Sequence, residues 1–471
     1  MEGLADPFGD RVVNEIPPPP VLPLDEGILY PSSDSKTPDW IAVRDHLAAE
    51  GTISKEHFVK MLHDATDIFK EEPNLIQFPE PLVMVGDIHG QLYDLIHLIE
   101  KAGDPSKTNY VFMGDYVDRG IFGVEVIIFM ISMKLNFPDS FAMLRGNHEC
   151  RNMTDHFTFR QEVIEKYDEE VYDLIMEMFD ALPICGLADK KYFITHGGIS
   201  PELKKISKIN KIDRFLEIPM DGIMCDLMWA DPIDEKEAKK YDFIENKERD
   251  CSFYFGRKPA KKLIDDNNLM TIVRAHQVQV DGYKMHRWDG PSSFPYVITI
   301  FSAPNYCDYY SNKGSVLILE DGNVSIKQFD DSEHPYHLPD RIDIFTWSMP
   351  FLIEKVVQMM KSVYTKWQED EPSDGEDFKS ATDLKERAEK IKGKVKAFAR
   401  VQKMYKTLTE ESELILKLKG MVPDGKIPRG LLLEGRPAIK DAIMEFKRAK
   451  ELDKQNEMRP KKKREARVIR S

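Results

Sequence analysis

Three short motifs rich in Gly and Asp constrain the fold of this chain more than any other feature. They are Gly-Asp-Ile-His-Gly at 86–90, Gly-Asp-Tyr-Val-Asp-Arg-Gly at 114–120 and Gly-Asn-His-Glu at 146–149. Each motif directly follows an apolar run with the length and composition of a buried strand. Because the carboxyl ends of parallel strands meet at one edge of a sheet, we expect the polar side chains of the three motifs to converge there.

Each motif alone has a plainer explanation, because Asp after a strand is often a helix N-cap and a Gly-Asp pair is often a turn. Three motifs in order, each after its own strand, make that explanation weak. Asp, His and Asn with no Cys among them suit a divalent or trivalent cation. Two later histidines also follow apolar strands. The candidate metal ligands are Asp87, His89, Asp115, Asn147, His196 and His276.

This set is large enough for two metal ions that share one bridging carboxylate, Asp115. Two such ions lower the pKa of a shared water to give a hydroxide nucleophile, and they clamp both ends of an in-line displacement at phosphorus. Arg119 suits a phosphoryl group, because guanidinium meets phosphate oxygens as a fork. His148 can protonate the leaving oxygen, with Asp118 holding its imidazole in position. A structural salt bridge for Arg119 and a metal-ligand role for His148 are the alternatives.

The composition narrows the class of protein. The chain has 471 residues and a formal net charge of −15, which argues against nucleic-acid binding, since phosphate contacts need a basic face. Its five cysteines are scattered and form no Cys-x-x-Cys pair, so we expect reduced thiols. The N-terminal residues do not resemble a signal peptide, and the most apolar run, 121–133, is too short to span a bilayer. We expect a cytoplasmic protein without a membrane span, and the basic run at 461–464 is a candidate nuclear import signal.

Hydrophobic periodicity predicts an α/β fold (an α+β sandwich), in which two mixed β-sheets pack face to face with flanking helices. Helices are expected at 37–50 and after Ser54, and alternating strands and helices over 81–145 indicate parallel pairing. One helical stretch is expected at about 157–179. The late strands lack long crossovers, so antiparallel pairing is expected for 296–301, 315–320 and 324–329.

The character of the sequence changes after Pro339. Residues 344–367 form a helical pattern that is apolar on most sides, so this helix must be buried on most sides. It is either the core helix of a second domain or a helix covered by another polypeptide. Residues 391–408 have the basic amphipathic pattern of a calmodulin target or a membrane-surface segment, with a solvated helix as the alternative. A shorter helical pattern follows at 443–452.

The longer strings around the motifs resemble the metallophosphoesterase superfamily, and within it the phosphoprotein phosphatase branch for Ser/Thr substrates. These strings are Gly-Asp-Ile-His-Gly-Gln (86–91), Gly-Asp-Tyr-Val-Asp-Arg-Gly (114–120), Leu-Arg-Gly-Asn-His-Glu-Cys-Arg (144–151), Thr-His-Gly-Gly-Ile-Ser-Pro (195–201), Trp-Ala-Asp-Pro (229–232), Arg-Ala-His (274–276) and Ser-Ala-Pro-Asn-Tyr (302–306). Residues 335–353, 407–413 and 418–420 resemble a narrower family, the calcineurin A catalytic subunits, which are calcium- and calmodulin-dependent phosphatases.

The resemblance implies a metallophosphoesterase-like catalytic domain at 37–338 with an Fe³⁺ (iron) and a Zn²⁺ (zinc) ion. Asp87, His89 and Asp115 would hold the iron, and Asp115, Asn147, His196 and His276 would hold the zinc. Arg119 and Arg249 would hold phosphate, with Tyr306 near the mouth of the site. The family has Gly after the second of these arginines, whereas this chain has Asp250, which could alter local charge or backbone freedom.

Composition distinguishes the arm, the acidic linker and the basic C-terminus, and the resemblance implies the binding and inhibitory roles of the segments between them. Outside the catalytic domain, the parts are an extended N-terminal arm (1–36), a helix for a calcineurin B-like EF-hand subunit (339–367, with contacts from 344–367), an acidic linker (368–384), a calmodulin-binding region (385–413, with its helix at 391–408), a second linker (414–442), an autoinhibitory segment (443–460) and a basic C-terminus (461–471). Glu457 would face the metal centre. Phosphoprotein substrates would dock on the edge strand 323–329 by β-augmentation, and on Tyr336, Trp347 and Phe351.

The sequence therefore predicts a calcium-gated Ser/Thr phosphoprotein phosphatase. One alternative is another dinuclear phosphoesterase, such as a nuclease or a nucleotide hydrolase, against which the acidic chain and the regulatory tail both count. The other alternative is a scaffold that has kept the fold and lost the chemistry. The complete set of candidate ligands, together with Arg119 and His148, argues against that loss.

Overall fold

The computed structural model of this protein describes residues 19–32, 37–335 and 453–460, together with scattered positions between 348 and 439. The chain falls into two compact units. One contains Met1–Cys307, Asn312–Glu333 and Glu457–Ser471, and the other contains Asp308–Ser311 and His334–Asn456. The first unit carries the three motifs.

The described residues form helices and strands along both units. The helices are α1 (Glu26–Leu29), α2 (Trp40–Ala48), α3 (Lys55–Glu71), α4 (Leu92–Ala102), α5 (Gly123–Asn136), α6 (Arg151–His156), α7 (Phe159–Lys166), α8 (Glu169–Ala181), α9 (Gly222–Trp229), α10 (Arg257–Asn267) and α14 (Leu431–Glu434), with short 3-10 helices at Ile206–Lys211, Tyr306–Asp308 and Asp453–Gln455. The strands are β1 (Leu75–Phe78), β2 (Leu82–Val85), β3 (Asn109–Phe112), β4 (Phe141–Met143), β5 (Cys185–Ala188), β6 (Tyr192–Thr195), β7 (Asp231–Pro232), β8 (Phe243–Glu245), β9 (Phe253–Phe255), β10 (Thr271–Arg274), β11 (Tyr283–His286), β12 (Val297–Ile300), β13 (Gly314–Glu320) and β14 (Asn323–Phe329).

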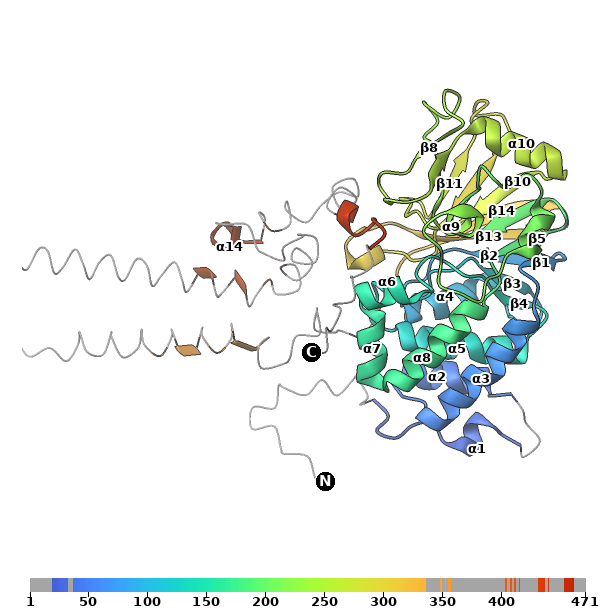
Figure 1. The fold of residues 1–471 in the computed structure, drawn as a ribbon. Helices are drawn as coiled ribbons and strands as arrows, with labels where there is room; N and C mark the ends of the chain where they lie inside the picture. The colour runs from blue at the N-terminus through green and yellow to red at the C-terminus, as the bar shows by residue number, and fades with distance from the viewer. Residues whose placement is uncertain are drawn as a thin grey trace, which may run out of the picture. The chain divides into compact units, whose positions relative to one another are not determined.

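Two mixed sheets pack face to face in the first unit, which confirms the predicted fold class (Figure 1). One has six strands in the order β1-β5-β6-β10-β12-β11, and the other has five in the order β14-β13-β2-β3-β4. Apolar side chains between the sheets form a shared core, with Met84 and Val111 from the five-stranded sheet and Ile194 and Val273 from the six-stranded sheet. A third, three-stranded sheet has the order β7-β9-β8.

Helices cover the outer face of each sheet (Figure 1). The side chains of α3, α4, α5, α7 and α8 form one core with the five-stranded sheet, and those of α9 and α10 form another with the six-stranded sheet. In β2, Val83 and Val85 pack toward the helices, whereas Leu82 and Met84 pack toward the other sheet. Because successive residues of a strand face opposite sides, a strand covered on both sides is apolar throughout.

The three strands that precede the motifs, β2, β3 and β4, lie side by side and parallel, as the alternation of strands and helices predicted. Val83 pairs with Tyr110, and Tyr110 pairs with Phe141. The three motifs follow the carboxyl ends of β2, β3 and β4, so the backbone brings them to one edge of the five-stranded sheet. This is the position in which open α/β sheets bind their ligands.

One expectation about the late strands was wrong. β13 pairs antiparallel with β14 and with β2, as predicted. However, β12, expected as the antiparallel strand 296–301, pairs parallel with β10 and antiparallel only with β11. The chain reaches β12 through β11, which the sequence analysis did not identify and which lies at the edge of the sheet. The chain therefore reverses direction twice, which makes β12 parallel to β10.

Two further expectations need correction. The stretch 157–179 is not one helix, because α7 ends before Tyr167 and α8 begins after Asp168, whose side chain accepts a hydrogen bond from the N–H of Val171 at 3.1 Å. The extended arm contains the short helix α1, whose Leu29 is buried. The N–H of Leu24 also donates to the carbonyl of Thr52 at 2.9 Å. Apolar anchors thus hold this part of the arm on the domain.

Much of the N-terminal arm and of the expected regulatory tail lies outside the described residues. This applies to residues 1–18, to the docking residues Tyr336, Trp347 and Phe351, to most of 344–367 and 391–408, to the acidic linker 368–384, and to 443–452 and 461–471. In the second unit, Ile415, Leu432 and Ile439 form a small apolar cluster against which Met404 and Leu408 pack.

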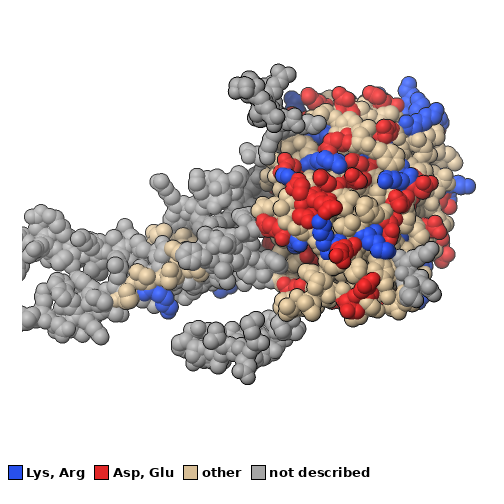
Figure 2. Space-filling view, turned by 60° about the horizontal axis from the view of Figure 1, so that its bottom comes forward, with Lys and Arg blue, Asp and Glu red and all other residues tan. Residues whose placement is uncertain are grey.

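Acidic and basic side chains are interspersed on the face of the domain seen in Figure 2. Among the described residues, no helix combines the length and the apolar character needed to cross a membrane.

Candidate metal centre and phosphate site

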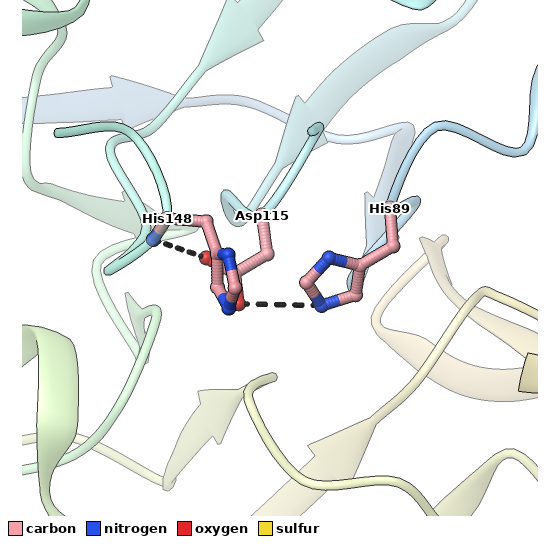
Figure 3. Close-up of side chains that lie close together, drawn as sticks. All are labelled: His89, Asp115 and His148. Atoms are coloured by element: carbon pink, nitrogen blue, oxygen red, sulfur yellow. Dashed lines mark hydrogen bonds and ion pairs between the residues drawn. The ribbon is translucent and has the colours of Figure 1, made fainter. Parts of the chain in front are cut away.

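Side chains from all three motifs point toward one another at the ends of β2, β3 and β4 (Figure 3). Nε2 of His89 lies 3.6 Å from Oδ2 of Asp115. The backbone N–H of His148 donates to Oδ1 of the same carboxylate at 3.0 Å. All three residues are buried, so Asp115 forms the centre of a group of potential metal ligands.

A second group of potential ligands shares Asp115 with the first and adds His196 and His276. Nε2 of His196 lies 3.3 Å from Oδ2 of Asp115, 3.2 Å from Nδ1 of His276 and 2.8 Å from Oδ1 of Asn147. Asp87 completes the set, because its Oδ2 lies 3.9 Å from Nε2 of His89. The structure thus brings the six predicted metal ligands together.

The ring nitrogens of two histidines have fixed roles. Nδ1 of His89 lies 2.8 Å from the carbonyl of Val117, and Nδ1 of His196 lies 2.9 Å from the carbonyl of Met113. A carbonyl can only accept a hydrogen bond, so Nδ1 carries the proton in both rings. This leaves Nε2 of each ring as the atom that can bind a metal, which is the usual way in which a backbone carbonyl orients a ligating histidine.

The electrostatics of the cluster favour a bound cation. Burial and the neighbouring Asp115 raise the pKa of Asp87 to about 7. Burial and the nearby His148 lower the pKa of His89 to about 3, and burial also lowers the pKa of His276 far below its ordinary value. The buried carboxylate of Asp87 thus lies beside the neutral imidazole of His89, and a metal ion would supply positive charge next to it. The oxygen and nitrogen ligands therefore fit a metal pair, although they do not select among the metals that accept such ligands.

Several site residues have an unusual backbone conformation. Non-glycine residues at positive φ cost on the order of 1 kcal/mol or more each and concentrate at functional sites. Those in the site are His89, Asp115, Asp118, Arg119 and His276, with φ between 49° and 71°. Gly114, at φ 108°, permits a close approach of two motif loops, because a Cβ there would lie 2.4 Å from the backbone of Gly146. The surrounding fold therefore holds the ligands in a preset arrangement.

Glu149 connects two of the motif loops, a role that the sequence analysis did not assign. Its carboxylate accepts hydrogen bonds from the N–H groups of Asp115, Tyr116 and Gly146 at 2.7, 2.8 and 2.9 Å. Burial and the nearby Asp115 raise its pKa to about 7. The only sequence signal for this role was its place at the end of the third motif.

His148 is paired with Asp118, as the sequence predicted. Its Nδ1 lies 2.7 Å from Oδ2 of Asp118, and Oδ1 of that carboxylate accepts the N–H of Phe159 at 3.0 Å. Burial alone would lower the pKa of His148, but Asp115 and Asp118 outweigh it and raise that pKa. A protonated imidazole in a fixed orientation suits a general acid. His148 also belongs to the first group of potential ligands, so the metal-ligand role is still the alternative.

Arg249 is held beside the metal ligands by Asp231. Its Nε donates to Oδ2 of Asp231 at 3.0 Å, and its Nη2 donates to the carbonyl of His276 at 3.1 Å. Oδ1 of Asp231 pairs with Arg274 at 2.8 Å, so one buried carboxylate orients two arginines. Asp231 lies in the string Trp-Ala-Asp-Pro (229–232), from which no role was predicted for it.

Arg119 and Tyr306, the remaining residues predicted to contact phosphate or line the mouth of the site, each lie next to an aromatic ring. The guanidinium of Arg119 is 4.4 Å from the ring centroid of Phe157. The ring of Tyr306 is 5.1 Å from that of His89. Both positions are compatible with contacts to a substrate over the metal ligands.

Asp250, where the family resemblance leads us to expect Gly, adopts φ 56°. This left-handed conformation costs a non-glycine residue free energy that glycine avoids, so we expect Asp250→Gly to raise the free energy of unfolding by about 1 kcal/mol. Thermal denaturation of the two proteins measures this difference. Asp250→Ala is the control, because it removes the carboxylate without freeing the backbone. An equal gain with Ala would show that charge, not conformation, is responsible.

A segment near the C-terminus contacts Arg249. The carboxylate of Glu457 forms an ion pair with Nη1 of Arg249. The N–H of Arg459 donates to the carbonyl of Arg249 at 2.8 Å. Nδ2 of Asn152 donates to the carbonyl of Pro460 at 3.0 Å. Residues 457–460 thus lie on the arginine that is predicted to hold phosphate.

Known proteins that this chain resembles are phosphoesterases or serine/threonine phosphatases. Residues 80–280 match the family model described as calcineurin-like phosphoesterase. The chain is 41% identical to the serine/threonine-protein phosphatase 2B catalytic subunit A1 of Saccharomyces cerevisiae, over 93% of this chain and 85% of that protein. It is 38% identical to subunit A2 of the same organism, over 96% and 83% of the two chains. A solved protein serine/threonine phosphatase from Saccharomyces cerevisiae, with similarity to human phosphatase PP5, matches with a TM-score of 0.57 and 30% identity, covering 62% of this chain and 95% of that one.

Proposed function

Since this chain belongs to the family of serine/threonine-protein phosphatase 2B catalytic subunits, which are calcineurin-like phosphoesterases, we propose that it hydrolyses phosphoserine and phosphothreonine in proteins under the control of calcium and calmodulin. The observation that carries the chemistry is the position of Asp115. This one buried carboxylate belongs to two groups of potential metal ligands.

Asp87, His89 and Asp115 would hold one metal ion, and Asp115, Asn147, His196 and His276 would hold the other, with Fe³⁺ and Zn²⁺ as the pair that the family resemblance implies. The metal pair, when bound, supplies an activated water nucleophile and neutralises charge on the phosphate.

Arg249 and Arg119 would bind and orient the phosphate, with Tyr306 beside it. The guanidinium of Arg249 is already oriented by Asp231, so little conformational freedom is lost when it binds. Arginine forks match phosphate oxygens in pairs.

His148 would donate a proton to the oxygen of the departing serine or threonine. Since Nδ1 pairs with Asp118, the proton would leave from Nε2. An alkoxide is a poor leaving group. Protonation of its oxygen as the bond to phosphorus breaks neutralises the developing negative charge, which is the role of a general acid.

A calcineurin B-like EF-hand subunit would cover the helix within 344–367. At the described positions of this helix, Leu352, Val356 and Met359 are 53%, 42% and 62% exposed. They are spaced four and three residues apart, so they lie on one helix face. A row of exposed apolar side chains at this spacing is what EF-hand proteins bind in their open grooves.

Calmodulin would bind the basic segment 391–408. Two apolar residues of that segment, Met404 and Leu408, pack against Ile415, Leu432 and Ile439. Calmodulin would need the same apolar side chains, so its binding would compete with this cluster and shift the population of the tail.

Glu457 supports an autoinhibitory role for the segment 443–460. Its carboxylate forms an ion pair with Nη1 of Arg249, whose guanidinium is proposed to bind phosphate. Because the segment is in the same chain, its effective concentration is high and weak contacts suffice.

Substrate docking would use the edge of the five-stranded sheet. β14 is the terminal strand in the order of that sheet, so its outer backbone groups can pair with an extended peptide. The second docking surface, at Tyr336, Trp347 and Phe351, stays a prediction.

Phosphopeptide hydrolysis by the complex of this chain with its EF-hand subunit tests the proposal. We expect low activity that rises at least about tenfold with calcium-loaded calmodulin, since the tethered segment must leave Arg249. A chain that ends before residue 443 should be active without calmodulin. Activity on nucleotides but not on phosphopeptides would contradict the substrate class. Full activity without calmodulin would contradict the inhibitory role of 443–460.

A further inference from the structure

Arg459 is an almost completely buried arginine in the C-terminal segment, with 4% of its surface exposed. Its Nη2 donates to the carbonyl of Ile218 at 2.6 Å, and its Nη1 donates to the carbonyl of Pro219 at 2.7 Å. Nη1 also lies 3.5 Å from Sγ of Cys225. The guanidinium carbon is 5.5 Å from the ring centroid of Trp229. We call these four partners the guanidinium site.

The guanidinium site suits arginine better than lysine. Its two carbonyls come from consecutive residues and accept from the two Nη atoms of one guanidinium, a fork that lysine cannot reproduce. The Trp229 ring adds an attraction that favours a planar cation. Burying a charge is costly unless it is well hydrogen-bonded, so this arrangement selects one kind of side chain.

The loop that carries these carbonyls is also held by other residues of the catalytic domain. Nη1 of Arg145 donates to the carbonyls of Arg214 and Leu216 at 3.0 and 2.9 Å. The carboxylate of Glu217 accepts the N–H groups of Arg151 and Asn152, both at 3.2 Å. None of these contacts involves the C-terminal segment. The guanidinium site is therefore built by the catalytic domain itself and can receive another arginine when Arg459 leaves.

The guanidinium site also has a fixed relation to the phosphate site. Glu457 places a negative group on Arg249, and Arg459 follows two residues later. The N–H of Arg459 donates to the carbonyl of Arg249, which links the two contacts. The segment thus presents an anionic side chain followed by an arginine at the second position after it.

We propose that the guanidinium site is a specificity site of the phosphatase, which favours substrates with arginine two residues after the phosphorylated serine or threonine. Arg459 then occupies the site as the corresponding residue of the inhibitory segment. This inference rests on the proposed function, and it adds the class of side chain that the enzyme reads beside the phosphate.

Matched phosphoserine peptides test the specificity. They differ only at the second position after phosphoserine, which is Arg, Lys or Ala, and the calmodulin-activated complex of the full chain is used so that the segment is displaced. We expect kcat/KM for the Arg peptide to exceed that for the Ala peptide by about tenfold, the size of one charged hydrogen bond, with Lys in between. Equal values for all three would overturn the inference and leave the phosphatase intact. No hydrolysis of any peptide would count against the proposed function instead.

Variants of the segment supply a second readout that does not depend on substrate choice. Without calmodulin, Arg459→Ala should raise the activity of the complex by about tenfold, because the segment loses its buried anchor. Arg459→Lys should recover only part of the inhibition. Met458→Ala is the matched control, since Met458 is the adjacent, exposed residue, and it should leave activity unchanged. If Arg459→Ala behaves like Met458→Ala, Arg459 does not anchor the segment.

Discussion

Replacing His148 by Gln should lower kcat for phosphopeptide hydrolysis by about 10²–10⁴-fold, which is the usual contribution of general acid catalysis. Gln keeps a polar side chain of similar size but cannot deliver a proton to the leaving oxygen. The pairing of Nδ1 with Asp118 at 2.7 Å and the raised pKa of His148 both favour the protonated ring. The loss should therefore appear in kcat more than in KM.

Metal analysis of the same variant separates the two roles open to His148. If it is the acid, the variant retains both metal ions and Asp118→Asn lowers kcat in the same direction, because the ring loses the carboxylate that orients it. Loss of one metal equivalent from His148→Gln would instead identify it as a ligand, as its place beside His89 and Asp115 allows. His97→Gln, on the helix α4, is the control and should behave like the wild type.

The sequence predicted the centre of this molecule well because the signals there are local. Asp87, Asp115 and Asn147 each follow an apolar run with the length and composition of a buried strand, and parallel order then placed them at one edge. The same strings carried the family resemblance, so the fold and the candidate ligands were predicted from the same few residues.

The parts that could not be predicted depend on contacts between residues far apart in the chain. Asp231 matters because Arg249 and Arg274 both reach it, and no spacing rule connects these three positions. Glu149 is adjacent to a predicted acid, yet its role depends on N–H groups in a loop more than 30 residues away. The parallel pairing of β12 with β10 was missed because the short edge strand β11 gave no clear pattern.

Arg459 illustrates the same limit for specificity. In the sequence it lies near the end of the predicted autoinhibitory segment 443–460, just before the basic run 461–464, and no local pattern marks it as an anchor. Only the fold brings the carbonyls of Ile218 and Pro219 to its guanidinium. Specificity of this kind is a property of loops held by the scaffold, so it follows from three-dimensional contacts and not from sequence pattern.

Replacing Asp115 by Asn should abolish measurable phosphatase activity and lower metal affinity by more than about 100-fold. Changes to groups that only support a ligand already cost 10- to 100-fold, and Asp115 belongs to both groups of ligands. Asn can still accept the N–H of His148, so the loop should keep its geometry. Metal content and kcat/KM measure the effect, and thermal denaturation checks that the variant is folded.

The exposed Asp67 of α3 provides the control, because Asp67→Asn removes the same charge outside the motifs and should change neither metal content nor activity.

Addition of excess metal to Asp115→Asn distinguishes weak metal binding from a chemical requirement for the carboxylate. If high metal concentration restores both occupancy and activity to Asp115→Asn, the carboxylate serves affinity alone. If occupancy returns without activity, the negative charge between the two ions is itself needed for the reaction. A variant that binds metal and hydrolyses phosphopeptides like the wild type would rule out Asp115 as the shared ligand, and with it the two-metal interpretation of the site.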